Sequence, residues 1–108
     1  MILVDTSIIV AWLDPSHQHH DKCSAALDQA AEDLAVSNIT YGELAAGGRT
    51  RESVDEDLTD FTRLLLDRGK PVLPDFFIRA QAAVYGLPLL TNDGRRRTAF
   101  PEVDFLLV

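Results

Sequence analysis

Four acidic residues each stand just beyond a short apolar run that has the character of a buried strand. The runs at residues 2–4, 36–37, 71–74 and 89–92 lead to Asp5, Glu43, Asp75 and Asp93 respectively. In an open parallel sheet the carboxyl ends of the strands share one edge. The pattern therefore predicts that four carboxylates far apart in the sequence converge at one edge of a sheet.

Converging carboxylates repel one another unless protons or cations lie between them. Mg²⁺ or Mn²⁺ suits such a cluster, because hard cations prefer oxygen ligands and Mg²⁺ keeps several waters. A metal held in this way can polarise a phosphodiester and activate water. Short polar neighbours could orient the carboxylates or a metal-bound water; they are Thr6, Ser7, Thr91 and Asn92.

Each acid also has a purely structural interpretation. Asp5 could cap a helix, and Thr40-x-x-Glu43 fits a capping box. Asp75 could complement a helix dipole or pair with Arg79, and Asp93-Gly94 could form a turn. None of these local roles requires the four acids to share one edge, which favours the metal interpretation.

The net charge of −7 is unfavourable for nucleic-acid binding through the surface as a whole, but the cations are unevenly placed. Six of the ten basic residues lie within eight positions after one of the four acids: Arg49, Arg51, Arg79, Arg95, Arg96 and Arg97. We expect Arg79 and the run 95–97 to contact RNA phosphates.

The histidines and the single cysteine carry weaker signals. His17, His19 and His20 lack the helical spacing of a strong zinc motif, and solvated loop residues are the preferred interpretation. Cys23, among small apolar residues, is interpreted as a core residue. One cysteine excludes an internal disulfide and a multi-thiolate metal site within one chain.

The pattern of strands and helices predicts one doubly wound α/β domain over residues 1–108. Strands are expected at 2–4, 34–37, 71–73, 87–90 and 103–108. Helices are expected at 8–13, 21–30, 40–46, 53–68 and 74–86. Asp21 is expected to cap the second of these helices, and Ser53-x-x-Glu56 is expected to form a capping box at the start of the fourth. The helix at 53–68 carries an acidic cluster on its solvated face.

The 108 residues suit a single domain, and 46% hydrophobic content is enough for one core. The longest apolar stretches fall short of the roughly 20 residues that span a bilayer, and no signal-peptide pattern opens the chain. These features predict a cytoplasmic protein without a membrane partner.

Several segments resemble the PIN-domain ribonucleases, in particular the VapC-like toxins of bacterial toxin-antitoxin pairs. The matching segments are Ile2-Leu3-Val4-Asp5-Thr6-Ser7, Thr40-Tyr41-Gly42-Glu43-Leu44, Asp75-x-x-Ile78-x-Ala80-x-Ala82, and residues 86–93, which read Gly-Leu-Pro-Leu-Leu-Thr-x-Asp. Arg96-Arg97-x-x-x-Phe100-Pro101 also resembles one branch of that family. The similarity spans nearly the whole chain.

The resemblance implies a three-layer α/β/α domain around a central parallel sheet of four or five strands. It further implies endoribonuclease activity that depends on Mg²⁺ or Mn²⁺, with Asp5, Glu43, Asp75 and Asp93 as the metal-binding acids. Homodimer formation and inhibition by a protein antitoxin are also implied. The segment between Glu43 and Asp75 is short compared with many members of the family.

Two other classes of function compete with the enzyme. A phospho-acceptor signalling module also places an aspartate at a strand end, but it needs a late lysine, and Lys70 precedes the last two predicted strands. A non-catalytic RNA-binding or partner-binding domain would retain the acids for stability. In that case removal of one acid should stabilise the fold.

Overall fold

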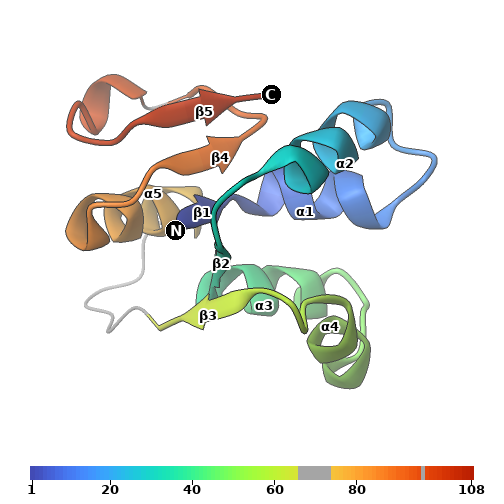
Figure 1. Cartoon of the computed structure of the whole chain (residues 1–108). Coiled ribbons are helices and arrows are strands. Elements are labelled where there is room, and N and C mark those ends of the chain that lie inside the picture. The colour runs from blue at the N-terminus through green and yellow to red at the C-terminus, as the bar shows by residue number, and fades with distance from the viewer. Residues whose placement is uncertain (66–73, 96) are drawn as a thin grey trace.

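A five-stranded parallel sheet forms the centre of the protein (Figure 1). The structure is a computed structural model that describes residues 1–65, 74–95 and 97–108, with Pro74 and Asp75 described by their backbone alone. The strands are β1 (Ile2–Val4), β2 (Leu34–Ser37), β3 (Thr62–Leu64), β4 (Leu89–Thr91) and β5 (Phe105–Leu107), in the spatial order β3-β2-β1-β4-β5. All four strand pairs are parallel, so the carboxyl ends share one edge, as predicted.

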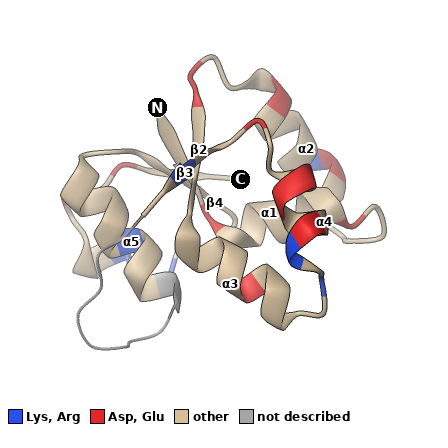
Figure 2. Cartoon of the chain, turned by 90° about the horizontal axis from the view of Figure 1, so that it is seen from below, with Lys and Arg blue, Asp and Glu red and all other residues tan. Residues whose placement is uncertain are grey.

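Five α-helices and one short 3₁₀ helix accompany the sheet. They are α1 (Thr6–Leu13), α2 (His20–Gln29), α3 (Asn38–Ala46), α4 (Arg51–Asp57), α5 (Pro74–Tyr85) and η1 (Arg97–Ala99). Figure 2 shows α5 on one side of the sheet and α1, α2 and α4 on the other. No helix in the described ranges has the length and apolar character needed to cross a bilayer.

The two faces of the sheet bury two separate apolar clusters, which makes the three-layer architecture. In β1, Ile2 and Val4 belong to the cluster beneath α1 and α2, whereas Leu3 belongs to the cluster beneath α5. This alternation follows from the two-residue period of a strand. Because β1 is central and covered on both faces, all three of its residues are buried.

Most predicted elements are confirmed within two residues at each end. Strands 2–4 and 34–37 coincide with β1 and β2, and Gly86 ends α5 with a positive φ of 65°. The predicted cap at Asp21 is wrong, because α2 begins at His20 and Asp21 lies in its first turn. The alternative interpretation of Thr40-x-x-Glu43 as a capping box is also wrong, because Ser37 caps α3 by accepting a bond from the Ile39 amide.

The predicted helix over residues 53–68 is wrong in its extent. Helix α4 ends at Asp57, and the chain then turns and enters β3. The Thr59 hydroxyl donates to the carbonyls of Asp55 and Glu56, both at 2.9 Å, which satisfies helix-end carbonyls and competes with helix continuation. Phe61 still reaches the core and packs against Trp12, with ring centroids 5.6 Å apart.

The third strand of the sheet is therefore β3 at Thr62–Leu64, which the sequence did not predict. The strand predicted at 71–73 lies outside the described residues, as do residues 66–68 of the predicted helix. The prediction was wrong because Val54, Leu58 and Phe61 have helical spacing although they do not share one helix. Val54 lies in α4, Leu58 is its C-cap and Phe61 lies in the following turn, yet all three side chains pack in one apolar cluster.

The predicted Ser53-x-x-Glu56 capping box is wrong as well, and the observed N-cap of α4 can be tested directly. Thr50 Oγ1 accepts a bond of 3.1 Å from the Ser53 amide, so Thr50 is the N-cap. We expect Thr50→Ala to lower the free energy of unfolding by about 1 kcal/mol. Ser53→Ala, at an interior helical position, should leave it unchanged or slightly raised. Urea denaturation measures both, and a larger loss in Ser53→Ala would contradict the observed cap.

Candidate functional site

Asp5 is the most deeply placed acid of the site. It follows β1 directly and is only 4% exposed. Its Oδ2 accepts hydrogen bonds from Thr91 Oγ1 at 2.6 Å and from Ser7 Oγ at 3.1 Å. Although Asp5 occupies the N-cap position of α1, its side chain makes no cap bond, so helix capping does not account for this carboxylate.

Arg79 supplies the positive charge nearest to Asp5. Its side chain is fully buried, and NH1 lies 3.9 Å from Asp5 Oδ2. NH2 donates to the Asp93 carbonyl at 2.7 Å, and Nε donates to the Arg95 carbonyl at 3.2 Å. Arg79 was predicted to contact RNA, but complete burial makes it an internal group that joins Asp5 to the loop after β4.

Glu43 reaches the same region from α3. Its Oε1 accepts a bond of 2.7 Å from Thr6 Oγ1, and Thr6 Oγ1 lies 2.9 Å from Thr40 Oγ1. Thr40 is therefore bound inside the structure and does not form the predicted capping box. These contacts tie α3 to the start of α1, and they orient one oxygen of the Glu43 carboxylate.

Asp93 lies after β4 and is held by Arg95. Arg95 Nε donates to Asp93 Oδ1 at 2.9 Å, and NH2 donates to Oδ2 at 2.7 Å. The Arg95 amide also donates to Oδ1 at 3.0 Å, which is the bond of an Asx turn and agrees with the turn interpretation of this position. The hydrogen bonds from Arg95 lower the pKa of Asp93 to about 2.

Asn92 and Ser7 connect the end of β4 to the start of α1. The Asn92 amide nitrogen donates to Ser7 Oγ at 3.1 Å, and its side chain donates to the Val108 carbonyl at 2.8 Å. Thr91 Oγ1 accepts a bond of 3.0 Å from the Asp93 amide. The four predicted orienting residues thus do contact the acids or their loops: Thr6, Ser7, Thr91 and Asn92.

One cavity of about 260 Å³ brings these groups together at the carboxyl edge of the sheet. It is lined by Asp5, Thr6, Ser7, Val10, His17, Glu43, Asn92 and Asp93. Three of the four predicted acids thus share one space. The backbone of Asp75 belongs to the first turn of α5, and its side chain lies outside the described part of the chain.

The donor types in this cavity suit a hard divalent cation, because carboxylates from three different elements face it. Among the described side chains, however, no three His, Cys, Asp or Glu groups lie close enough together to hold one ion. Both oxygens of Asp93 are occupied by Arg95. A cation bound at Asp93 therefore requires Arg95 to move aside.

His17 lines the cavity although its sequence context predicted a solvated loop residue. Its Nδ1 accepts a bond of 3.0 Å from the His19 amide, so the neutral ring carries its hydrogen on Nε2. The loop after α1 turns back through the bond of the His17 amide to the Asp14 carbonyl. No sequence signal identifies such a return, because only the folded loop brings His17 beside Asp5.

The arginines after Asp93 differ in their surroundings. The Arg95 side chain is 80% exposed, and Arg97 is exposed with Nε bound to the Gly94 carbonyl at 3.1 Å. Arg96 lies outside the described residues. Contact of this run with RNA stays a prediction.

Comparison with known proteins agrees with this architecture. The PIN domain family model matches residues 2–74, which is more than half of the chain. The chain belongs to the PIN domain family. The sequence resemblance is thereby confirmed for the family, and PIN domains are generally nucleases. The match includes Asp5 and Glu43 and ends before Asp75 and Asp93.

Several solved structures share this fold. A toxin-antitoxin complex from Klebsiella pneumoniae has 22% identity, a TM-score of 0.74 and 95% coverage of both chains. FitAcB from Neisseria gonorrhoeae has 26% identity and a TM-score of 0.70, and the match covers 97% of this chain and 96% of that one. VapBC2 from Rickettsia felis, bound to a promoter DNA fragment, has 17% identity, a TM-score of 0.72 and 97% coverage of both chains. No curated protein matches the sequence.

The ion pair at Asp93 has a measurable consequence in protein kept free of metal by a chelator. Since the pKa of Asp93 is about 2, below the value of about 3.9 for an unfolded chain, the ionised carboxylate stabilises the fold above about pH 4. This contribution is lost as the pH falls from there through 2. We expect Arg95→Gln to raise the pKa of Asp93 toward its ordinary value, as measured by carboxyl NMR titration.

Asp14 serves as an internal control in the same titration. Hydrogen bonds from Ser16 lower its pKa, and Arg95 is not among the groups that shift this pKa. Arg95→Gln should leave the Asp14 titration unchanged. An Asp93 curve identical in both proteins would show that Arg95 does not hold this carboxylate in solution.

Proposed function

We propose that this protein is a metal-dependent endoribonuclease that hydrolyses RNA phosphodiesters and acts as the toxin of a toxin-antitoxin pair. The observation that carries the proposal is the single cavity lined by Asp5, Glu43 and Asp93 at the carboxyl edge of a PIN fold. These acids come from three separate segments, and no local structural role requires them to meet there.

The proposed metal ligands are Asp5, Glu43, Asp93 and Asp75, with Mg²⁺ or Mn²⁺ as the ion. When bound, such an ion supplies Lewis-acid polarisation of the phosphodiester and activation of water. Thr91 and Ser7 fix Oδ2 of Asp5, so Oδ1, to which no described residue donates, is the oxygen available for a ligand. Thr6 fixes Oε1 of Glu43 in the same manner.

Positive charge for RNA comes from the loop after β4. Arg95 holds Asp93 in the described structure, and its side chain is 80% exposed, so binding of a metal at Asp93 would release the guanidinium to contact RNA. It can then bind a phosphate oxygen, together with Arg96 and Arg97. Arg79 remains buried and acts by compensating the charge of Asp5.

The assignment as a toxin rests on the structural comparisons. The similar structures are a toxin-antitoxin complex, FitAcB and VapBC2. By this similarity we infer that a protein antitoxin binds the chain, and that the chain forms a homodimer. Membership of the PIN family also removes the reason for the phospho-acceptor hypothesis.

A non-catalytic RNA-binding or partner-binding domain is the second candidate. The occupation of both Asp93 oxygens by Arg95 favours it, because the described side chains satisfy one another without an ion. The two candidates differ in what the acids do. In the enzyme they hold a metal, whereas in the alternative they only maintain the loop after β4.

The enzyme proposal predicts loss of RNA cleavage on substitution of Asp5. We expect purified Asp5→Asn to cut a mixed cellular RNA pool at least about 100-fold more slowly, because metal stabilisation of transition-state charge is worth several kcal/mol. A chelator should abolish wild-type cleavage, and Mg²⁺ should restore it. Mapped ends of the fragments would report the cleavage position.

Asp33→Asn is the matched control for this assay. It makes the same chemical change at an exposed residue directly before β2, at the opposite edge of the sheet. It should cleave at the wild-type rate. Wild-type activity in Asp5→Asn, with contaminating nuclease excluded and folding verified by circular dichroism, would refute the catalytic role of Asp5.

Thermal melting with and without Mg²⁺ separates the two candidates. When the concentration of free Mg²⁺ is ten times its Kd for one site, binding stabilises the fold by about 1.4 kcal/mol. This raises the Tm of a domain of this size by several degrees. We expect this rise in the wild type and not in Asp93→Ala. Because Asp93 is paired with Arg95, its removal should not raise the Tm without metal. A magnesium-independent wild-type Tm would favour the non-catalytic domain.

A further inference from the structure

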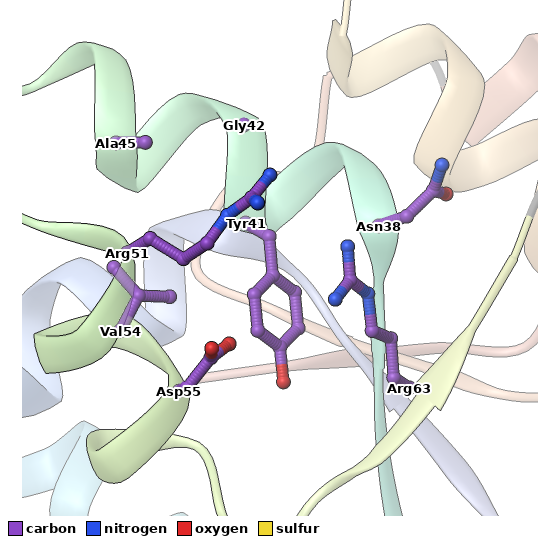
Figure 3. A pocket seen from close by; sticks show the side chains of 8 residues that line it. All are labelled: Asn38, Tyr41, Gly42, Ala45, Arg51, Val54, Asp55 and Arg63. Atoms are coloured by element: carbon purple, nitrogen blue, oxygen red, sulfur yellow. The ribbon is translucent and has the colours of Figure 1, made fainter.

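A second cavity lies beside α3 and shares no lining residue with the proposed active site. Figure 3 shows the side chains that line it. Its volume is about 430 Å³, and its lining includes Asn38, Tyr41, Gly42, Arg51, Asp55 and Arg63. At 100° per residue, Asn38, Tyr41 and Gly42 share one face of α3, whereas Glu43 lies on the opposite face with Thr40. One helix therefore separates the two cavities.

The cavity contains a preformed stack of an arginine on an aromatic ring. The guanidinium carbon of Arg63 lies 4.1 Å from the centroid of the Tyr41 ring. Arg63 belongs to the edge strand β3, is exposed, and lines the cavity. Arg and aromatic planes are the surfaces on which single-stranded bases stack.

The charges in the cavity favour an anionic ligand. Two arginines face it, Arg51 and Arg63, against the single carboxylate of Asp55. Within residues 1–65, 74–95 and 97–108 neither arginine forms an ion pair. Among the charged side chains that line the cavity, positive charge exceeds negative charge by one, and the other acids of α4 lie outside this lining.

Gly42 gives an independent indication that the cavity beside Tyr41 is not filled by the protein's own side chains. Glycine in a helix interior costs about 1 kcal/mol relative to alanine. A Cβ at Gly42 would meet no atom within 4 Å, so packing within the chain does not require glycine. The absent side chain leaves room beside Tyr41, which an external group can use.

We propose that this cavity binds one nucleotide of the RNA substrate, next to the segment held at the active site. Its base stacks on the Arg63 guanidinium and its phosphate binds Arg51. The inference rests on the proposed RNase function and adds a subsite to it. Helix α3 is about 10 Å across, which is roughly three nucleotides at the 3.4 Å rise of a stacked strand.

Two variants test the subsite by different means. Arg63→Gln removes the stacking cation, whereas Gly42→Leu keeps every charge and fills the cavity. Binding of a fluorescently labelled, unstructured 12-nucleotide RNA is measured by anisotropy in the presence of a chelator, so that no cleavage occurs. We expect each variant to raise the Kd about tenfold, the effect of one lost base stack.

Arg49→Gln is the control for loss of charge. Arg49 pairs with Asp57 at 3.5 Å and does not line the cavity, so this variant should raise the Kd less than about twofold. Melting curves check the fold, and Gly42→Leu should melt no lower than the wild type, since leucine favours helix more than glycine. Kd values for Arg63→Gln and Gly42→Leu equal to that of Arg49→Gln would overturn the subsite.

Cleavage assays distinguish failure of the subsite from failure of the proposed function. With Mg²⁺, Gly42→Leu should cut the 12-nucleotide RNA with a raised KM, and a dinucleotide too short to span α3 at the wild-type rate. If the wild type cuts RNA and Gly42→Leu does so with unchanged KM, the subsite is refuted while the function stands. If the wild type cuts nothing but binds RNA in a Gly42-dependent way, the function is refuted while the subsite stands.

Discussion

The buried carboxylate of Asp5 is the group on which the geometry of the site depends. It stands at the end of the central strand, where water is largely excluded, and a buried charge there is costly unless it is paired and hydrogen-bonded. Thr91, Ser7 and Arg79 meet this requirement from β4, α1 and α5. The need to compensate one charge thus fixes the relative positions of three elements at the same edge of the sheet.

Arg79 extends this constraint to the loop after β4. Its guanidinium carries several donors in a rigid plane, so a single side chain can approach Asp5 and also bind the carbonyls of Asp93 and Arg95. The loop that presents Asp93 to the cavity is therefore held from inside the protein. Helix α3 plays the corresponding role on the other side, where it presents Glu43 to the proposed active site and Tyr41 to the second cavity.

Prediction from the sequence succeeded where burial alone determines structure. Residues 2–4 and 34–37 are short aliphatic runs with no alternative to a covered strand, and both were predicted without error. It failed at residues 53–68, where Val54, Leu58 and Phe61 have helical spacing but belong to a helix, its end and the turn before β3. The spacing of hydrophobic residues indicates which side chains are buried, but it does not indicate where a helix ends. Helix α4 ends where the Thr59 hydroxyl competes with backbone amides for the carbonyls of Asp55 and Glu56.

The sequence by itself determined the parallel α/β architecture, and it placed Asp5 and Asp93 at one edge, because the ends of parallel strands must coincide. Glu43 was predicted at the same edge, but it reaches the cavity from within helix α3. Only the tertiary structure decided that Arg79 is buried and that Arg95 donates hydrogen bonds to both carboxylate oxygens of Asp93. It also decided that His17 lines the cavity and that Arg63 stacks on Tyr41. The positions of most strands and helices follow from the local hydrophobic pattern. These contacts join residues from different elements, and their distances are set by packing that no local pattern encodes.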